Sequence, residues 1–233
     1  MSNKGLFPSS LSKKYAMAAT GLFLCLFLVG HLLGNLQLFQ SGQAGKDAFN
    51  EYALFMTTFP LVKLLSYLTY FGILLHVVDG FMLVAANRAA RPTRYVMENG
   101  AANSGWSSRN MAVLGTIVLA FIVTHMQNFW YVMHFGEVAT YALDGVEVKD
   151  LHRVVLAFFG PENGLAWLAV AFYVLAQLAI GFHLWHGFSS AFQSFGLRSV
   201  TYTPWIERFG KAFSVLVPLG FAIIPVYLYV IQH

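Results

Sequence analysis

Charge is what this sequence has least of. Only 10% of its 233 residues are charged, whereas 58% are hydrophobic. Because water-soluble domains usually carry about 25% charged residues, the composition excludes an ordinary soluble domain. The few charges lie between long uncharged runs, which is typical of a helical protein that crosses the bilayer several times. We therefore read the net charge of +4 as a matter of membrane topology, and we expect no nucleic-acid partner.

Cysteine is almost absent. Cys25 is the only one, and it lies inside the first apolar run. A disulfide within the chain is thereby excluded, as is a zinc or iron–sulfur site built on cysteines of this chain. We interpret Cys25 as a small core or lipid-facing residue.

Five apolar runs reach the length of about 20 residues that a membrane-spanning helix needs. They cover residues 15–39, 61–87, 111–135, 164–195 and 212–232. The first run follows lysines, as a signal peptide would, but it exceeds the 7–15 apolar residues, approximately, of such a peptide and has no small-residue cleavage pattern. We expect a retained span. With no repeat and no low-complexity tract, residues 1–233 predict a single all-α domain, a bundle of five transmembrane helices.

The basic residues predict the orientation of this bundle. If the N-terminus is inside, the inner segments hold ten of the fourteen Lys and Arg residues. These ten are Lys4, Lys13, Lys14, Arg88, Arg91, Arg94, Arg109, Arg198, Arg208 and Lys211. Most of the acids fall on the other side; the inner loops hold Glu98 and Glu207. The positive-inside rule therefore places the N-terminus in the cytoplasm and the C-terminus outside. Two outer loops, 40–60 and 136–163, carry apolar residues at helical spacing and predict interfacial helices.

Four spans each contain one deeply placed histidine. They are His31, His76, His125 and His183, on the first four spans in order. A single buried histidine is commonly a hydrogen-bonded core residue. Four such residues on four helices are harder to explain that way, because each is costly in hydrocarbon. Neutral imidazole is a good iron ligand, and haem is a common reason for a helix bundle to carry paired histidines.

The depths of the histidines predict how they pair. His31 lies sixteen residues after Tyr15, and His125 sixteen after Arg109, so both lie about 24 Å from the inner ends of their helices. The second and fourth spans run inwards, and their histidines lie only about 15 Å from the inner ends. We therefore expect one pair nearer the outside, His31 with His125, and one nearer the inside, His76 with His183. Each pair is spaced to bind one iron from opposite faces.

Small residues accompany these histidines. Gly72 and Gly80 flank His76 at four residues on either side, and Gly187 and Gly34 follow the histidines of their own helices. The glycines predict clearance for a flat macrocycle, with ordinary close helix packing as the alternative.

Among the remaining histidines, His186 competes with His183, because it lies one turn away and could bind a haem propionate or the iron itself. We prefer His183 because it has Gly187 four residues later, as His76 has Gly80. His134, His152 and His233 are placed at the outer boundary, in a loop and at the C-terminus.

The sequence resembles the cytochrome b membrane anchor of succinate dehydrogenases and quinol:fumarate reductases, of the five-helix, two-haem type. The motif ATGLFLCLFLVGHLLGN at 19–35 and the motif FHLWHGFSSAFQSFG at 182–196 carry the resemblance. The other spans match mainly in the positions of His76 and His125. The resemblance implies two haems b with bis-histidine ligation, and the family pairs the same helices as the depth estimate.

The resemblance also implies partners and a location. A flavoprotein subunit and an iron–sulfur subunit would dock on the cytoplasmic side, and electrons would reach membrane quinone, usually menaquinone in two-haem anchors. The expected location is the bacterial inner (cytoplasmic) membrane, which the chain crosses several times, as part of respiratory complex II.

Three positions depart from the family or stay open. Some fumarate reductases carry a proton-relaying glutamate two residues before the ligand of the fourth helix, where this chain has Gly181. Glu51 is the nearest candidate for a quinone-site acid, although a solvated surface acid is the preferred interpretation. Asp79, one turn after His76, is expected to pair with a basic residue of the inner loop, 88–109.

Two other functions share the four-histidine observation. The first is the cytochrome b subunit of a membrane hydrogenase or formate dehydrogenase, whose partner usually docks outside; the arginine-rich inner loops and the first motif argue against it. The second is a transporter or metal channel, which would use broken helices and acids beside the histidines. Here Pro218 and Pro225 are the prolines within a span, and that span lacks a deep histidine.

Overall fold

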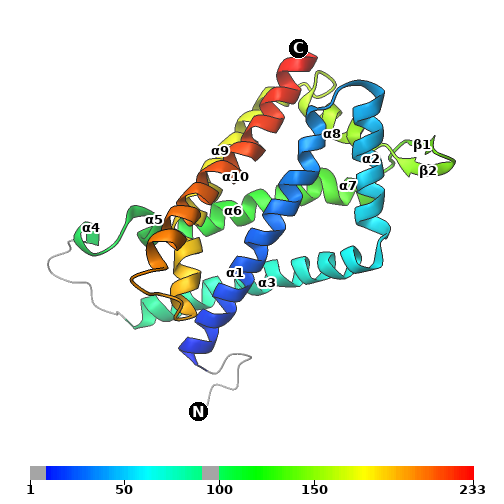
Figure 1. Ribbon diagram of the computed structural model, residues 1–233. Helices are drawn as coiled ribbons and strands as arrows, with labels where there is room; N and C mark the ends of the chain where they lie inside the picture. The colour runs from blue at the N-terminus through cyan, green and yellow to red at the C-terminus, as the bar shows by residue number, and fades with distance from the viewer. Residues whose placement is uncertain (1–8, 91–99) are drawn as a thin grey trace.

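Five long helices form an all-α bundle, as the sequence predicts. The computed structural model describes residues 9–90 and 100–233 (Figure 1). Each of the five is long and apolar enough to cross a membrane. They are α1 (Ser10–Asn35), extended by the 3-10 turn η1 (Leu36–Phe39); α3 (Pro60–Ala89); α6 (Met111–His125), continued by the π-helical turn η2 (Met126–Tyr131) and α7 (Val132–Phe135); α9 (Ala166–Ser194); and α10 (Thr203–Gln232). The first turn of α1 and the last turn of α10 lie at opposite ends of the bundle. The end at the start of α1 is called the inner end below and the opposite end the outer one, after the orientation that the sequence predicts.

The helix boundaries agree with the sequence to within about two residues, except that α1 begins at Ser10 instead of residue 15 and that α10 also begins early. We expected the fifth helix at residue 212, whereas it begins at Thr203. Pro204 stands in its first turn, where the fixed φ of proline suits a helix start and its missing N–H is not needed. The polar residues up to Lys211 continue the helix beyond the apolar run, which a search for uncharged stretches does not detect.

Helices α9 and α10 pack closely along their length (Figure 1). The contact depends on Gly181, because a Cβ there would lie 3.0 Å from the Ser214 carbonyl oxygen of α10. Pro218, one turn after Ser214, has no N–H for that carbonyl. The position where some relatives of the resembled family carry a relay glutamate is therefore used here for close helix packing.

Short elements close the outer end of the bundle. Both predicted interfacial helices form, as α2 (Gly42–Thr58) and α8 (Leu151–Phe159). An antiparallel hairpin of β1 (Thr140–Leu143) and β2 (Val146–Lys149), which the sequence did not predict, precedes α8 in the chain and contacts α2. Its turn is Asp144-Gly145, with φ of 49° and 81°, the conformation that Asp-Gly favours in two-residue hairpins. On the inner side lie α4 (Gly100–Asn103) and α5 (Trp106–Arg109), while Lys4, Arg91, Arg94 and Glu98 fall outside the described residues.

A buried polar network joins α2, the hairpin and α8. Asn50, only 1% exposed, donates to Asp150 Oδ1 (3.1 Å) and to the Tyr141 hydroxyl (3.3 Å), and accepts from the His152 N–H (2.9 Å). Lys46 bonds the other oxygen of Asp150 at 2.7 Å. Burial opposes ionisation of Asp150, but the hydrogen bonds from Lys46 and Asn50 lower its pKa overall. A lowered carboxyl pKa stabilises the fold above the ordinary value of about 4, and this contribution is lost as the pH falls through the lowered pKa.

We expect Asn50→Ala to destabilise the outer cap by about 1–3 kcal/mol, because it leaves the buried His152 N–H without an acceptor and removes one of the hydrogen bonds to Asp150. Hydrogen exchange of the β1–β2 and α8 amides in detergent measures this opening. Gln43→Ala on the same helix is the matched control, since Gln43 bonds Asp47 at an exposed position. Equal exchange in the two variants would contradict a supporting role for Asn50.

Candidate functional site

The structure brings the four deep histidines together in two pairs. The rings of His31 (α1) and His125 (α6) have centroids 5.7 Å apart at an angle of 78°. The rings of His76 (α3) and His183 (α9) have centroids 6.2 Å apart at 64°. These are the pairs that the depth estimate predicts. That either pair binds iron stays a prediction.

All four rings are only partly buried, although they lie deep within spans. No hydrogen bond joins the two rings of either pair in the part of the chain that the structure describes. A polar ring in hydrocarbon needs a hydrogen bond or a ligand to offset its lost hydration. Each pair therefore has ring nitrogens able to bind a ligand, and part of its surface is exposed within the membrane-spanning region.

Aromatic side chains surround the outer pair. Phe27 stacks on His31 with centroids 5.3 Å apart, and Phe221 of α10 packs on the same ring at 5.4 Å. Around His125 lie Phe121 (5.6 Å), Phe129 (5.4 Å) and Tyr173 (6.1 Å). Helix α10 thus contributes an aromatic ring where the other spans contribute histidines. Such a lining excludes water and suits a flat apolar ligand.

Helix α1 holds the inner pair through His76. The Thr20 hydroxyl donates to the Ala16 carbonyl at 2.7 Å and lies 3.0 Å from His76 Nδ1. With its proton on the carbonyl, the hydroxyl is free to accept from Nδ1–H, and the tautomer of His76 that makes this bond keeps Nε2 as a lone pair. Hydrogen bonds of this kind orient metal-binding histidines and set their tautomer. A Cβ on Gly21 would lie 3.3 Å from His76 Cε1, so glycine lets the ring approach α1.

The same arrangement recurs on α6. A Cβ on Gly115 would lie 3.6 Å from His183 Cε1. Gly21 precedes His31 by ten residues, and Gly115 precedes His125 by ten residues. Ten residues of helix span about 15 Å. Each of the two helices therefore contributes a ring to the outer pair and a glycine contact to the inner one.

The glycines named from the sequence do not act as a group. Gly34 packs against the Tyr52 ring, Gly72 against Phe23 and Gly80 against Met17, so close helix packing accounts for these three. Of these four glycines, only Gly187 has open space around the position of an added Cβ. The glycines that do contact the histidines, Gly21 and Gly115, stand on the facing helices, where spacing along the ligand's own helix cannot reveal them.

Three buried polar groups in this region lack a hydrogen-bond partner among the described residues. They are both oxygens of Asp79, Oε1 of Gln177 and Nδ1 of His183. Asp79 is 2% exposed. The expected ion pair with a basic residue of the inner loop does not form with any described residue, and Arg91 and Arg94 lie outside them.

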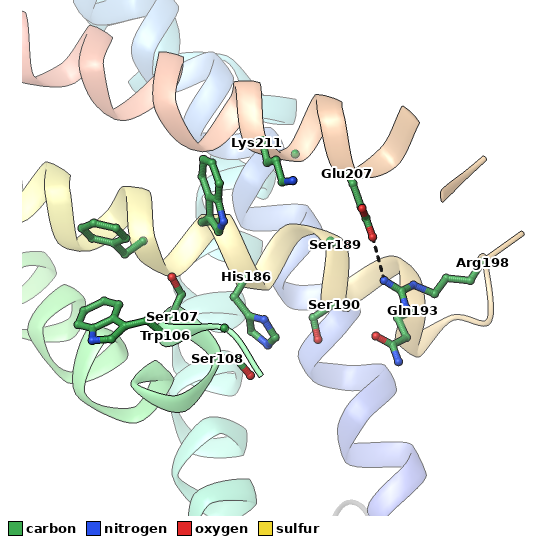
Figure 2. A pocket seen from close by; sticks show the side chains of 14 residues that line it. Trp106, Ser107, Ser108, His186, Ser189, Ser190, Gln193, Arg198, Glu207 and Lys211 are labelled. Atoms are coloured by element: carbon green, nitrogen blue, oxygen red, sulfur yellow. Dashed lines mark hydrogen bonds and ion pairs between the residues drawn. The ribbon is translucent and has the colours of Figure 1, made fainter. Parts of the chain in front are cut away.

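The other histidines have separate places. His186 does not meet His76; it lines a cavity at the inner ends of α9 and α10 (Figure 2). His134 stacks on Trp130 at 4.4 Å, and His233 bonds the Tyr229 carbonyl. His152 is buried in the outer cap against Phe49, and burial lowers its pKa, partly offset by Asp150.

Glu51 lines a second cavity, of about 390 Å³, at the outer side. It is exposed there, and the other walls are Gln37, Ala48, Tyr52 and Phe55. Tyr52 packs on Gly34, one turn after His31, so this cavity adjoins the helix that carries the outer pair.

The residues present fit haem better than a bare metal ion. The described residues contain no group of three or more His, Cys, Asp or Glu able to hold a metal by themselves. Haem iron needs only two axial protein ligands. Two imidazoles on opposite sides of one metal, with bonds of about 2 Å, have ring centres roughly 6 Å apart, which is near both separations seen here.

Comparison with known proteins adds no relative. No protein-family profile, curated protein or solved structure matches this chain.

We expect Thr20→Val to lower the free energy of unfolding by about 1–3 kcal/mol, because it removes the hydroxyl that pairs with Nδ1 of the half-buried His76 ring. Thr20→Ser, which keeps the hydroxyl, should be close to the parent. Thermal unfolding in detergent is the measurement. Thr116→Val is the control, because the exposed Thr116 hydroxyl bonds only its own helix. An equal loss in the Thr20→Val and Thr116→Val variants would contradict the role of Thr20.

Proposed function

We propose that this chain is the di-haem cytochrome b anchor of a succinate:quinone oxidoreductase. The observation that carries the proposal is the presence of two histidine pairs, each across two helices, at two depths of a five-helix bundle. In this proposal His31 and His125 hold the outer haem, and His76 and His183 hold the inner one. Haem b, when bound, supplies one-electron chemistry at two depths between a soluble dehydrogenase and membrane quinone.

The chain's own contribution is to hold, orient and shield these groups. Thr20 orients His76, and Phe121, Phe129 and Tyr173 keep water from His125. The spacing of about 15 Å along α1 and α6 keeps two sites apart yet close enough to succeed one another across a bilayer about 30 Å thick. A single site could not bridge that thickness.

The partners and location follow from the same proposal. A flavoprotein and an iron–sulfur subunit dock at the basic inner end, where Arg88, Arg109, Arg198 and Arg208 lie. The membrane is the bacterial inner membrane, and the quinone is menaquinone. Anchors of hydrogenases or formate dehydrogenases would also use paired histidines; the positive charge on the inner side favours the succinate-linked type over that alternative.

The outer cavity at Glu51 is the proposed quinone position. Its walls combine a carboxylate, a phenol and an amide with an aromatic ring, and it adjoins the helix that carries His31. Quinone reduction takes up protons, and an exposed carboxylate at the outer side can exchange them with water.

The ligand assignment has a direct spectroscopic test. We expect the dithionite-reduced protein to show haem b absorption from two haems. His31→Ala and His125→Ala should remove the same haem, and His76→Ala and His183→Ala the other one. His186→Ala is the control and should retain both.

An absence of haem b from the correctly folded protein would end the proposal. Loss of the inner haem in the His186→Ala variant, with its retention in His183→Ala, would instead reassign one ligand and leave the function standing.

The quinone position is tested by Glu51→Gln. We expect slower haem reduction by a water-soluble naphthoquinol, roughly tenfold or more if the carboxylate transfers the proton, with unchanged haem content and unchanged reduction by dithionite. Stopped-flow absorbance measures the rate. Asp47→Asn on the same helix is the matched control. If both variants match the parent, Glu51 is a solvated surface acid.

A further inference from the structure

A cavity of about 840 Å³ opens at the inner end of the bundle, outside both histidine pairs (Figure 2). Helices α9 and α10 form two of its walls, and the segment around α5 forms the third. Its polar lining comprises Ser107, Ser108, His186, Ser189, Ser190, Gln193, Arg198, Glu207 and Lys211. None of the four proposed iron ligands lines this space, and His186 is the one lining residue that the sequence analysis linked to haem.

Several hydrogen-bond donors that line the cavity have no partner among the described residues. Elsewhere in the spans, hydroxyls donate to the carbonyl one turn earlier, as Ser66 and Thr69 do. The hydroxyls of Ser189 and Ser190 make no hydrogen bond with any described residue, and the same holds for the His186 ring. Donors left free at the membrane boundary point to a ligand that accepts hydrogen bonds.

The charge of the cavity is positive. Arg198 and Glu207 form an ion pair at 3.1 Å and balance each other (Figure 2). Among the lining residues in the described part of the chain Glu207 is the one acid, so Lys211 is left there as a net positive charge. Its ammonium lies 5.8 Å from the centre of the Trp185 ring. An anion is therefore the complementary ligand.

The rim of the cavity is apolar and faces outwards. Trp106 is 55% exposed, Trp185 44% and Phe182 48%. Tryptophan favours the boundary between headgroups and acyl chains. This exposed apolar surface continues towards the membrane centre at Leu178 and Leu175, which lie about one and two turns before Phe182 on α9. A polar, positive pocket thus leads directly into a hydrocarbon-facing strip.

We propose that this cavity binds the headgroup of an anionic phospholipid of the inner leaflet. The phosphate accepts hydrogen bonds from Lys211, His186 and the serine pair, and an acyl chain lies along α9. Basic pockets between spanning helices on the cytoplasmic side are suited to such headgroups. Free phosphate offers the same acceptors, but it makes no use of the apolar strip. The inference does not depend on haem.

The test is lipid retention by the full chain. The protein is reconstituted with equal amounts of phosphatidylglycerol and phosphatidylcholine and extracted in detergent, and the bound lipid is counted by mass spectrometry. We expect Lys211→Gln to retain roughly tenfold less phosphatidylglycerol or lower still, as loss of a charge-assisted hydrogen bond implies. Lys14→Gln, at an exposed inner position outside the cavity, should retain the parent amount.

A double variant keeps the test decisive if Lys211→Gln does not fold. Ser189→Ala with Ser190→Ala removes two unused hydroxyls and introduces a better helix former, so the fold should persist while phosphatidylglycerol retention falls. Parent-like retention in this variant or in Lys211→Gln would overturn the proposal. Displacement of the lipid by millimolar inorganic phosphate would also overturn it, because the site would then prefer the free anion.

Discussion

Placing a polar imidazole ring in hydrocarbon costs free energy, and the packing around the four deep histidines depends on how that cost is offset. Each deep histidine loses hydration that the lipid cannot replace. The structure offsets part of that loss in two ways. Thr20 provides a hydrogen bond to His76, and aromatic rings enclose His125. The rest of that loss is not offset. Two facing pairs of rings keep exposed surface, and they are the part of the molecule best suited to bind a ligand.

Much of the fold could be predicted because the bilayer makes the pattern simple. Long uncharged runs are unambiguous, and the depth of a histidine follows from counting residues along a helix of known rise. The interfacial helices α2 and α8 were also predicted, from apolar residues at helical spacing. The start of α10 was not, because Glu207 and Lys211 extend a helix past the point where apolarity ends.

Features that depend on a facing helix could not be predicted. Gly21 and Gly115 look like ordinary glycines in the sequence, and only the packing of α1 on α3 and of α6 on α9 sets them against histidine rings. The glycines that counting did select, such as Gly34, turned out to accommodate a tyrosine. The hairpin at Asp144-Gly145 had a recognisable turn signal, but it is small and lies within a loop first read for its amphipathic helix. Sequence spacing thus predicts which histidines meet, but it does not predict which residues surround them.

The ten-residue interval between glycine and histidine on α1 and α6 couples the geometry of the two histidine pairs. Inserting or deleting one residue inside either interval would rotate the helix beyond that point by about 100° and shift it by about 1.5 Å. Such a change could not be absorbed by one pair alone, since the glycine belongs to one pair and the histidine to the other. Substitutions can change individual side chains in these segments. Insertions and deletions would disrupt both pairs. The same interval on α1 and α6 sets the distance between the two histidine pairs.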